Sequence, residues 1–448
     1  MKKDSRGIAL TNADEFALGR YEDAVEQFAS YVGDPVATVD EALERRPEFV
    51  AGHILKALVL YTLAERRFAT MAGEALERAR AQASAANERE RGLIAAAAAL
   101  VDSRWDDASL ALDRVLADHP RDALALQVAH LMDFYRGDAL NLRNRVSRVL
   151  PHWDESTRGY SYVLGMHAFG LEEMNQYPQA EATALRALSL QPKDGWAVHA
   201  AVHVMEMQGR IDEGIALLRN RESDWAPDNA FAFHNFWHLA LFCMDGARYD
   251  EALALFDRHV YPGPAAYILS LVDATALLWR LQLEGVDVGD RMPHVADDWA
   301  ARVAQETGFY AFNDVHAAMA FAMAGRGDAL ADLAARMEAP SRVDNPNARI
   351  VREIGIPLVN GIAAFARGRY ASAVEAIEPV RDTAHRFGGS HAQRDVLTLT
   401  LIEAAVRAGD TSRARHYAGE RIVHKPASAW GERLWRRAGG SGQVRGRA

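Results

Sequence analysis

Histidine and glutamate recur at helical spacing in the middle of the chain. His199 and His203 are four residues apart, Glu206 follows three residues later, and His234 and His238 repeat the spacing of four. Residues four apart share one face of a helix, so each stretch would present two imidazoles side by side. Imidazole and carboxylate groups together can transfer protons near neutral pH. These five residues are therefore the candidate acid/base groups.

Histidine pairs at this spacing also bind zinc, but the sequence carries no specific metal signature. It has one cysteine, Cys243, no His-Glu-x-x-His motif, and sixteen histidines, which give i, i+4 pairs by chance in a helical chain. We therefore expect no metal and no cofactor, and any catalysis to be metal-free acid/base chemistry. No Walker loop, dinucleotide fingerprint or nucleophile elbow is present. Cys243 lies among apolar residues, which predicts a core position.

Further residues could bind a ligand beside these groups. Asp273 and Arg280 are seven apart and so share a helix face, and the run 388–395 (GGSHAQRD) places glycines, a serine and an arginine at an expected helix start, where an anion can be held. For each position a plainer alternative stays open: a core histidine, an internal ion pair or a simple helix cap. The candidate ligand-binding residues are His167, Glu173, Asp273, Arg280, His316, His391 and Arg394.

The elements that position these residues are expected to be helices. Long segments are rich in Ala, Leu, Glu and Arg with apolar residues at helical spacing. Between them a pattern recurs: a small or polar residue, often Arg, an aromatic or apolar residue, two variable residues, and Ala or Gly. This predicts a turn between two helices that approach closely at the final small residue. The pattern occupies 19–24, 103–108, 175–180, 209–214, 247–252, 368–373 and 409–414.

The spacing of these turns predicts the fold. The closing small residues at 180, 214 and 252 are 34 and 38 residues apart, and a period of about 34 residues is typical of tetratricopeptide (TPR) repeats. We predict an all-α protein, an α-solenoid of TPR-like antiparallel helical hairpins over residues 1–430. The Arg/Gly-rich residues 431–448 are expected to form a disordered tail. An irregular helical bundle is the alternative.

Composition excludes several classes of protein. The 448 residues are 49% hydrophobic with a formal net charge of −10, and no block of Lys and Arg lies in an aromatic-rich stretch, so we expect no nucleic-acid or membrane partner. A single cysteine suits a reducing compartment. No apolar run resembles a signal peptide or a membrane span, and a cytoplasmic location is expected.

Four motifs in order resemble the tetratricopeptide repeat protein 38 family. They are HAAVHVMEMQGR at 199–210, HNFWHLAL at 234–241, the helix from Asp273 to Arg280, and GGSHAQRD at 388–395. The resemblance covers roughly residues 10 to 425. It implies an α-solenoid with its polar motifs in the middle and C-terminal repeats, and it implies no biochemical activity.

Two functions follow as hypotheses. In the first, His, Glu and Arg side chains line a central pocket, closed by inserted loops, that binds a small anionic molecule and catalyses acid/base chemistry if the protein is an enzyme. In the second, the chain is an interaction scaffold that binds a peptide or partner in the concave groove. The sequence does not decide between binding and turnover, and it leaves the oligomeric state open.

Overall fold

The computed structural model describes residues 1–339 and 345–440, and these residues form two compact units. The first unit comprises residues 1–201, 222–232 and 345–347, and the second comprises residues 202–221, 233–344 and 348–448. The chain passes between the units inside helix α11 (Gly195–Gln208), after Ala201.

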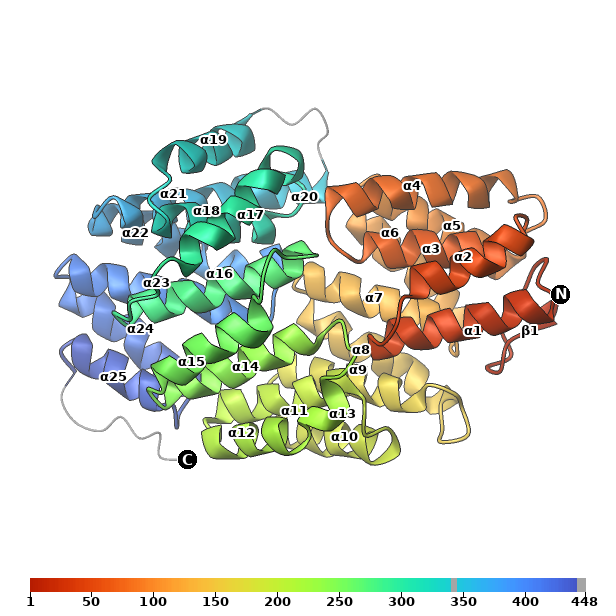
Figure 1. The fold of residues 1–448 in the computed structure, drawn as a ribbon, viewed down its shortest axis with the longest axis horizontal. Coiled ribbons are helices and arrows are strands. Elements are labelled where there is room, and N and C mark those ends of the chain that lie inside the picture. Colours follow the sequence, from red (N-terminus) through yellow and green to blue (C-terminus); the bar gives the residue numbers. More distant parts are fainter. Residues whose placement is uncertain (340–344, 441–448) are drawn as a thin grey trace. The chain divides into compact units, whose positions relative to one another are not determined.

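The first unit is built from consecutive helices joined by short turns (Figure 1). Helix pairs α1 with α2, α3 with α4, α5 with α6 and α9 with α10 pack against each other, which is the arrangement of antiparallel helical hairpins. A two-stranded antiparallel ribbon precedes them. The elements are β1 (Lys2–Lys3), β2 (Ala9–Leu10), α1 (Glu15–Ser30), α2 (Pro35–Arg45), α3 (Val50–Tyr61), α4 (Arg66–Ala81), α5 (Glu88–Val101), α6 (Trp105–Asp118), α7 (Ala123–Tyr135), α8 (Ala139–Val149), η1 (Leu150–His152), α9 (Tyr160–Glu173), α10 (Tyr177–Leu190), the first half of α11, and α13 (Glu222–Trp225).

The second unit continues the same architecture. Helices α17 with α18, α21 with α22 and α23 with α24 pack as neighbours, and α16 also contacts α18 and α23. The elements are the second half of α11, α12 (Ile211–Asn220), α14 (Ala232–Asp245) after its first residue, α15 (Tyr249–Leu255), η2 (Phe256–Val260), α16 (Ile268–Leu283), α17 (Arg291–Glu306), α18 (Ala311–Met323), α19 (Gly327–Glu338), the last three residues of α20 (Pro346–Ile350), η3 (Val351–Gly355), α21 (Ile356–Ala366), α22 (Tyr370–Ile377), η4 (Glu378–Phe387), α23 (His391–Arg407), α24 (Thr411–His424) and α25 (Ala429–Arg437).

The predicted turns explain why the helices end where they do. At six of the seven sites the first residue of the pattern adopts a positive φ, which ends the preceding helix in a left-handed residue. The next helix then begins at the aromatic or apolar position, as α6 does at Trp105 and α15 at Tyr249. The pattern at 19–24 is the exception: it lies inside α1, because Gly19 keeps a helical backbone there. The all-α hairpin fold predicted from the sequence is confirmed.

Close approach accounts for the small residues of the pattern. In the second unit, a Cβ on Gly214 of α12 would lie 2.2 Å from the ring of Phe242 on α14. Phe242 is fully buried, so its ring has little room to move. The alanines at 108, 180, 252, 373 and 414 are likewise fully buried. Small side chains at this position allow neighbouring helices to pack closely.

The chain end differs from the sequence-based expectation. Residues 429–437, which include part of the predicted tail, form α25, and Trp430 and Leu434 are buried. Trp430 N donates to Asp245 Oδ1, and Ser428 Oγ donates to Asp245 Oδ2 at 2.5 Å. Residues 431–437 of the predicted tail thus lie in α25, residues 441–448 lie outside the described residues, and the boundary of the tail stays a prediction. The extent of one continuous solenoid over 1–430 stays a prediction.

Two further expectations concern single features. Cys243 is fully buried in α14, as its apolar neighbours predict. Among the described residues, no helix combines the length and the apolar character that crossing a bilayer requires.

Candidate functional site

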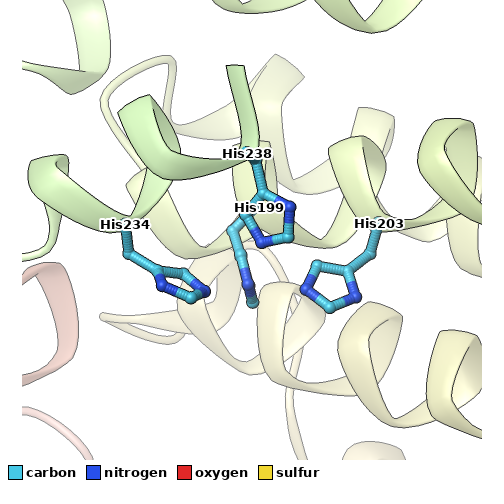
Figure 2. Close-up of side chains that lie close together, drawn as sticks. All are labelled: His199, His203, His234 and His238. Carbon is cyan, nitrogen blue, oxygen red and sulfur yellow. The ribbon is translucent and has the colours of Figure 1, made fainter. Parts of the chain in front are cut away.

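Three imidazoles meet in the second unit. His203 comes from α11, and His234 and His238 come from successive turns of α14 (Figure 2). The ring centroids of His203 and His238 are 4.5 Å apart, and those of His234 and His238 are 4.8 Å apart. Each of the three residues offers one ring nitrogen, and these three nitrogens all lie within 4.8 Å of one another. We call these three residues the histidine cluster.

Two of these rings are oriented by a carboxylate each. Nδ1 of His234 lies 2.6 Å from Oδ2 of Asp273 on α16, and Nδ1 of His238 lies 2.9 Å from Oε2 of Glu206 on α11. A carboxylate only accepts hydrogen bonds, so each pair places a proton on Nδ1. In the neutral tautomer Nε2 then carries the lone pair. The ring of His234 also stacks on Trp237, with centroids 5.3 Å apart.

Burial and the neighbouring charged groups together set the charge of the Glu206–His238 pair. Burial and the neighbouring His203 hold the pKa of His238 well below its usual range, although the bond to Glu206 opposes this. Burial raises the pKa of Glu206, but Lys425 and His238 outweigh this, so the net pKa lies well below that of an ordinary glutamate. The pair therefore consists of a carboxylate and a neutral imidazole at neutral pH.

Glu206 joins the histidine cluster to a second set of charges. Lys425 Nζ donates to Glu206 Oε1 at 2.7 Å and lies 3.6 Å from Asp395 Oδ2. Arg421 holds Asp395 with Nε and Nη2 contacts of 2.9 Å each. Burial raises the pKa of Asp395, but the opposite effect of Arg421 and Lys425 is larger and lowers this pKa to about 2. We call Glu206, Lys425, Asp395 and Arg421 the polar network.

A pocket of about 320 Å³ opens beside the polar network in the second unit. Its walls come from η4, α23 and α24, with one residue, Met207, from α11. The lining holds four cationic side chains and three carboxylates, together with three histidines. The polar lining residues are Arg381, Asp382, His385, His391, Arg394, Asp395, Thr398, Glu420, Arg421, His424 and Lys425.

The structure separates the predicted ligand-binding residues of the second unit. His391 and Arg394 line the pocket. Asp273 contacts His234, as described above. Arg280 is fully buried, donates from Nη2 to the backbone carbonyls of Ala392 and Gln393 at the start of α23, and lies over the ring of Trp237. Arg280 thus tethers α16 to α23 and does not line the pocket.

The remaining candidates belong to the first unit. Nε2 of His167 lies 3.0 Å from Ser147 Oγ, and burial lowers the pKa of His167. Glu173 is buried at the end of α9. His199, also drawn in Figure 2, precedes His203 by one turn of α11, and in the first unit its ring packs against Phe169, Trp196 and Phe231. The catalytic or ligand-binding roles of all twelve candidates stay predictions.

His316 on α18 is a buried histidine outside the pocket. Its Nδ1 lies 2.8 Å from the Phe312 carbonyl oxygen, and its ring packs on that of Phe312 with centroids 4.5 Å apart. Burial lowers its pKa to about 4; the bond to Phe312 opposes the shift and Arg280 adds to it. These contacts match the plainer alternative, a core histidine.

Replacing His316 by Gln is expected to flatten the pH dependence of stability. Below pH 6.5 the unfolded histidine takes a proton, whereas the folded one stays neutral until about pH 4. Stability therefore falls as the pH drops through this window, by about 2 kcal/mol between pH 6.5 and 5 from this residue alone. Urea unfolding at the two pH values measures it. Equal pH slopes in the two proteins would contradict the assignment.

Sequence reasoning missed Lys425 and Arg421, which complete the polar network. Arg421 lies on the buried face of α24, and Lys425 ends that helix. A cation at a helix C-terminus is ordinary, so neither position stands out in the sequence. Asp395 lies within the GGSHAQRD run, but nothing local reveals that its partners come from α24. Only the packing of α23 on α24 shows the connection.

Comparison with known proteins assigns no activity to the chain. No family model matches the chain, so membership of the tetratricopeptide repeat protein 38 family stays a prediction. The human IFIT1 dimer with m7Gppp-AAAA is 13% identical with a TM-score of 0.44, covering 93% of this chain and 98% of that one. A monomeric mutant of IFIT1 with Gppp-AAAA is 14% identical with a TM-score of 0.43, covering 94% and 99%.

A third solved structure, Naa15/Naa10 bound to HypK-THB, is 12% identical with a TM-score of 0.24, covering 94% of this chain and 67% of that one. At these identities and scores the matches assign no ligand to this chain. The expectations of a cytoplasmic location and of no nucleic-acid partner therefore stay predictions. The helices and their turns establish the fold alone: the described residues form TPR-like antiparallel helical hairpins.

Proposed function

We propose that the chain binds a small anionic molecule in the pocket of its second unit. The observation that carries this proposal is the lining: Arg381, Arg394, Arg421 and Lys425 surround one cavity of about 320 Å³. Pockets of about this volume suit small metabolites. Arginine pairs with carboxylates and phosphates through two parallel hydrogen bonds, which favours such groups as ligands.

The internal ion pairs assign different tasks to these cations. Arg381 binds Glu420 through two contacts of 3.0 and 2.8 Å, and Arg421 binds Asp395. These two arginines mainly build the wall. Arg394 donates to the Gly389 carbonyl oxygen, is part-buried and lines the pocket. We therefore assign Arg394, with His391 beside it, to ligand recognition.

The position of the pocket links binding to the candidate acid/base groups. Lys425 lines the pocket and bonds Glu206, and Glu206 bonds His238. A bound anion would change the field at Lys425, and this change would reach the histidine cluster through one carboxylate. The proposal thus places recognition and proton-transfer groups in adjacent sites of one unit.

Ligand binding is tested with a panel of small anions. We expect thermal-shift screening of carboxylates and phosphate esters, followed by calorimetry, to find a member that binds one per chain. Arg394→Gln should weaken that binding at least tenfold, because a charged bidentate contact is lost. Arg326→Gln is the matched control, since Arg326 pairs with Asp297 on the surface of the same unit.

Two results would argue against this function. If no anion binds, the peptide-binding scaffold becomes the better explanation, and immobilised peptide libraries test it. If an anion binds equally to both variants, the pocket is not its site.

A further inference from the structure

The histidine cluster has the geometry of a metal-binding site. His203, His234 and His238 direct ring nitrogens toward a common point from two helices, within 4.8 Å of one another (Figure 2). In a tetrahedral site with Zn–N bonds of about 2.0 Å, neighbouring nitrogens are about 3.3 Å apart. The limit of 4.8 Å exceeds this spacing by about 1.5 Å, so the rings would have to turn toward an ion as it binds.

The carboxylates behind the cluster are the second observation. Histidines that bind metals usually donate the other ring N–H to a carboxylate, which fixes the tautomer and raises the basicity of the ligand nitrogen. Asp273 does this for His234 at 2.6 Å, and Glu206 does it for His238 at 2.9 Å. Both carboxylates are buried, so the two imidazoles are held in place. A core histidine needs only one hydrogen-bond partner and no convergence with other imidazoles.

We propose that His203, His234 and His238 bind one divalent transition-metal ion of the zinc class. Three neutral imidazoles suit zinc, cobalt, nickel, copper and iron, and they do not suit magnesium or calcium, which prefer oxygen ligands. The site belongs to the second unit alone.

The charges around the cluster favour a cation. Asp273 and Glu206 bring two negative charges next to the imidazoles, and Lys425 offsets one of them. A divalent ion would therefore enter a buried site next to the negatively charged carboxylates of Asp273 and Glu206. This proposal replaces the sequence-based expectation of no metal, because spacing alone does not show that His203 faces His234 and His238 or that Asp273 and Glu206 bond their rings.

The test is a metal titration of the full chain, freed of any histidine tag and stripped with a chelator. We expect Co²⁺ to bind one per chain with the visible absorption of a four-coordinate ion, and Zn²⁺ to displace it. His203→Ala, His234→Ala and His238→Ala should each weaken Co²⁺ binding at least 100-fold. His416→Gln is the control: it changes an exposed histidine of the same unit outside the cluster and should bind as the wild type does.

A second measurement covers variants that fail to fold. X-ray absorption of the zinc-loaded wild-type chain should show three nitrogen ligands at about 2.0 Å with the scattering of imidazole rings. The proposal is overturned by a wild-type chain that binds neither ion, by folded variants that bind as the wild type does, or by fewer than two imidazoles at the ion. Anion binding at the pocket is measured separately, so either proposal can fail alone.

Discussion

Replacing Lys425 by Met is expected to lower the free energy of unfolding by about 3 kcal/mol, the cost of removing one partner from a buried ion pair. Lys425 and Glu206 are each 7% exposed in their side chains, and Nζ lies 2.7 Å from Oε1. Without the ammonium group, Glu206 is left as a carboxylate with a large desolvation cost. The pKa of Glu206 would rise toward neutrality, and its contact with His238 would no longer be that of a fully charged carboxylate.

Denaturant unfolding at pH 7 measures the loss, and a double-mutant cycle with Glu206→Gln assigns it to the pair. The double variant should be more stable than the sum of the single effects predicts, by at least about 1 kcal/mol. Arg336→Met is the control: Arg336 and Asp332 form an ion pair in the same unit with side chains 45% and 53% exposed, so its loss should cost under about 1 kcal/mol. Additive effects in the cycle would show that Lys425 stabilises the fold through packing alone.

The same variant tests whether Lys425 takes part in anion binding at the pocket. Met is close to Lys in length and lacks its charge, so the cavity keeps its shape while losing one cation. An anion that binds near Lys425 should bind Lys425→Met more weakly than the wild type. Unchanged affinity would place the ligand nearer to Arg394, on the other part of the lining.

The fold could be predicted from the sequence because its signals are local. Most of these turns combine a residue that tolerates a positive φ, an aromatic or apolar residue that begins the next helix, and a small residue at a close approach. Gly209, Ile211 and Gly214 show all three, since φ is +69° at Gly209 and Gly214 meets Phe242. At Gly19 the sequence matches the turn pattern, but Gly19 keeps a helical backbone and α1 continues through it.

The site could be predicted only in part, because helical spacing gives a face and not its partners. The i, i+4 pair on α14 was visible, and the structure shows that it faces His203. Lys425 is 219 residues from Glu206 in sequence, and Asp273 is 39 residues from His234, so no local pattern connects them. Arg280, which shares a helix face with Asp273, instead caps backbone carbonyls of α23.

The position of Asp273 leads to the second large effect, which depends on the proposed metal. Asp273→Asn should weaken Co²⁺ or Zn²⁺ binding by about 10- to 100-fold without changing the ratio of one ion per chain. The carboxylate accepts from Nδ1 of His234 at 2.6 Å and so makes its Nε2 a stronger donor to the ion. A neutral amide of the same shape keeps the packing but removes the charge, and it can also turn its NH₂ group toward the ring.

Competitive titration against a chelating dye measures this loss of affinity, and circular dichroism confirms that the variant is folded. Asp382→Asn, on an 80% exposed side chain of the same unit, is the control and should leave the affinity unchanged. A positioning role also predicts a shifted Co²⁺ spectrum in Asp273→Asn and partial rescue in Asp273→Glu, neither of which follows from a contact that only stabilises the fold. If the folded Asn variant binds with wild-type affinity, His234 does not depend on Asp273, and the cluster must be oriented by Glu206 and helix packing instead.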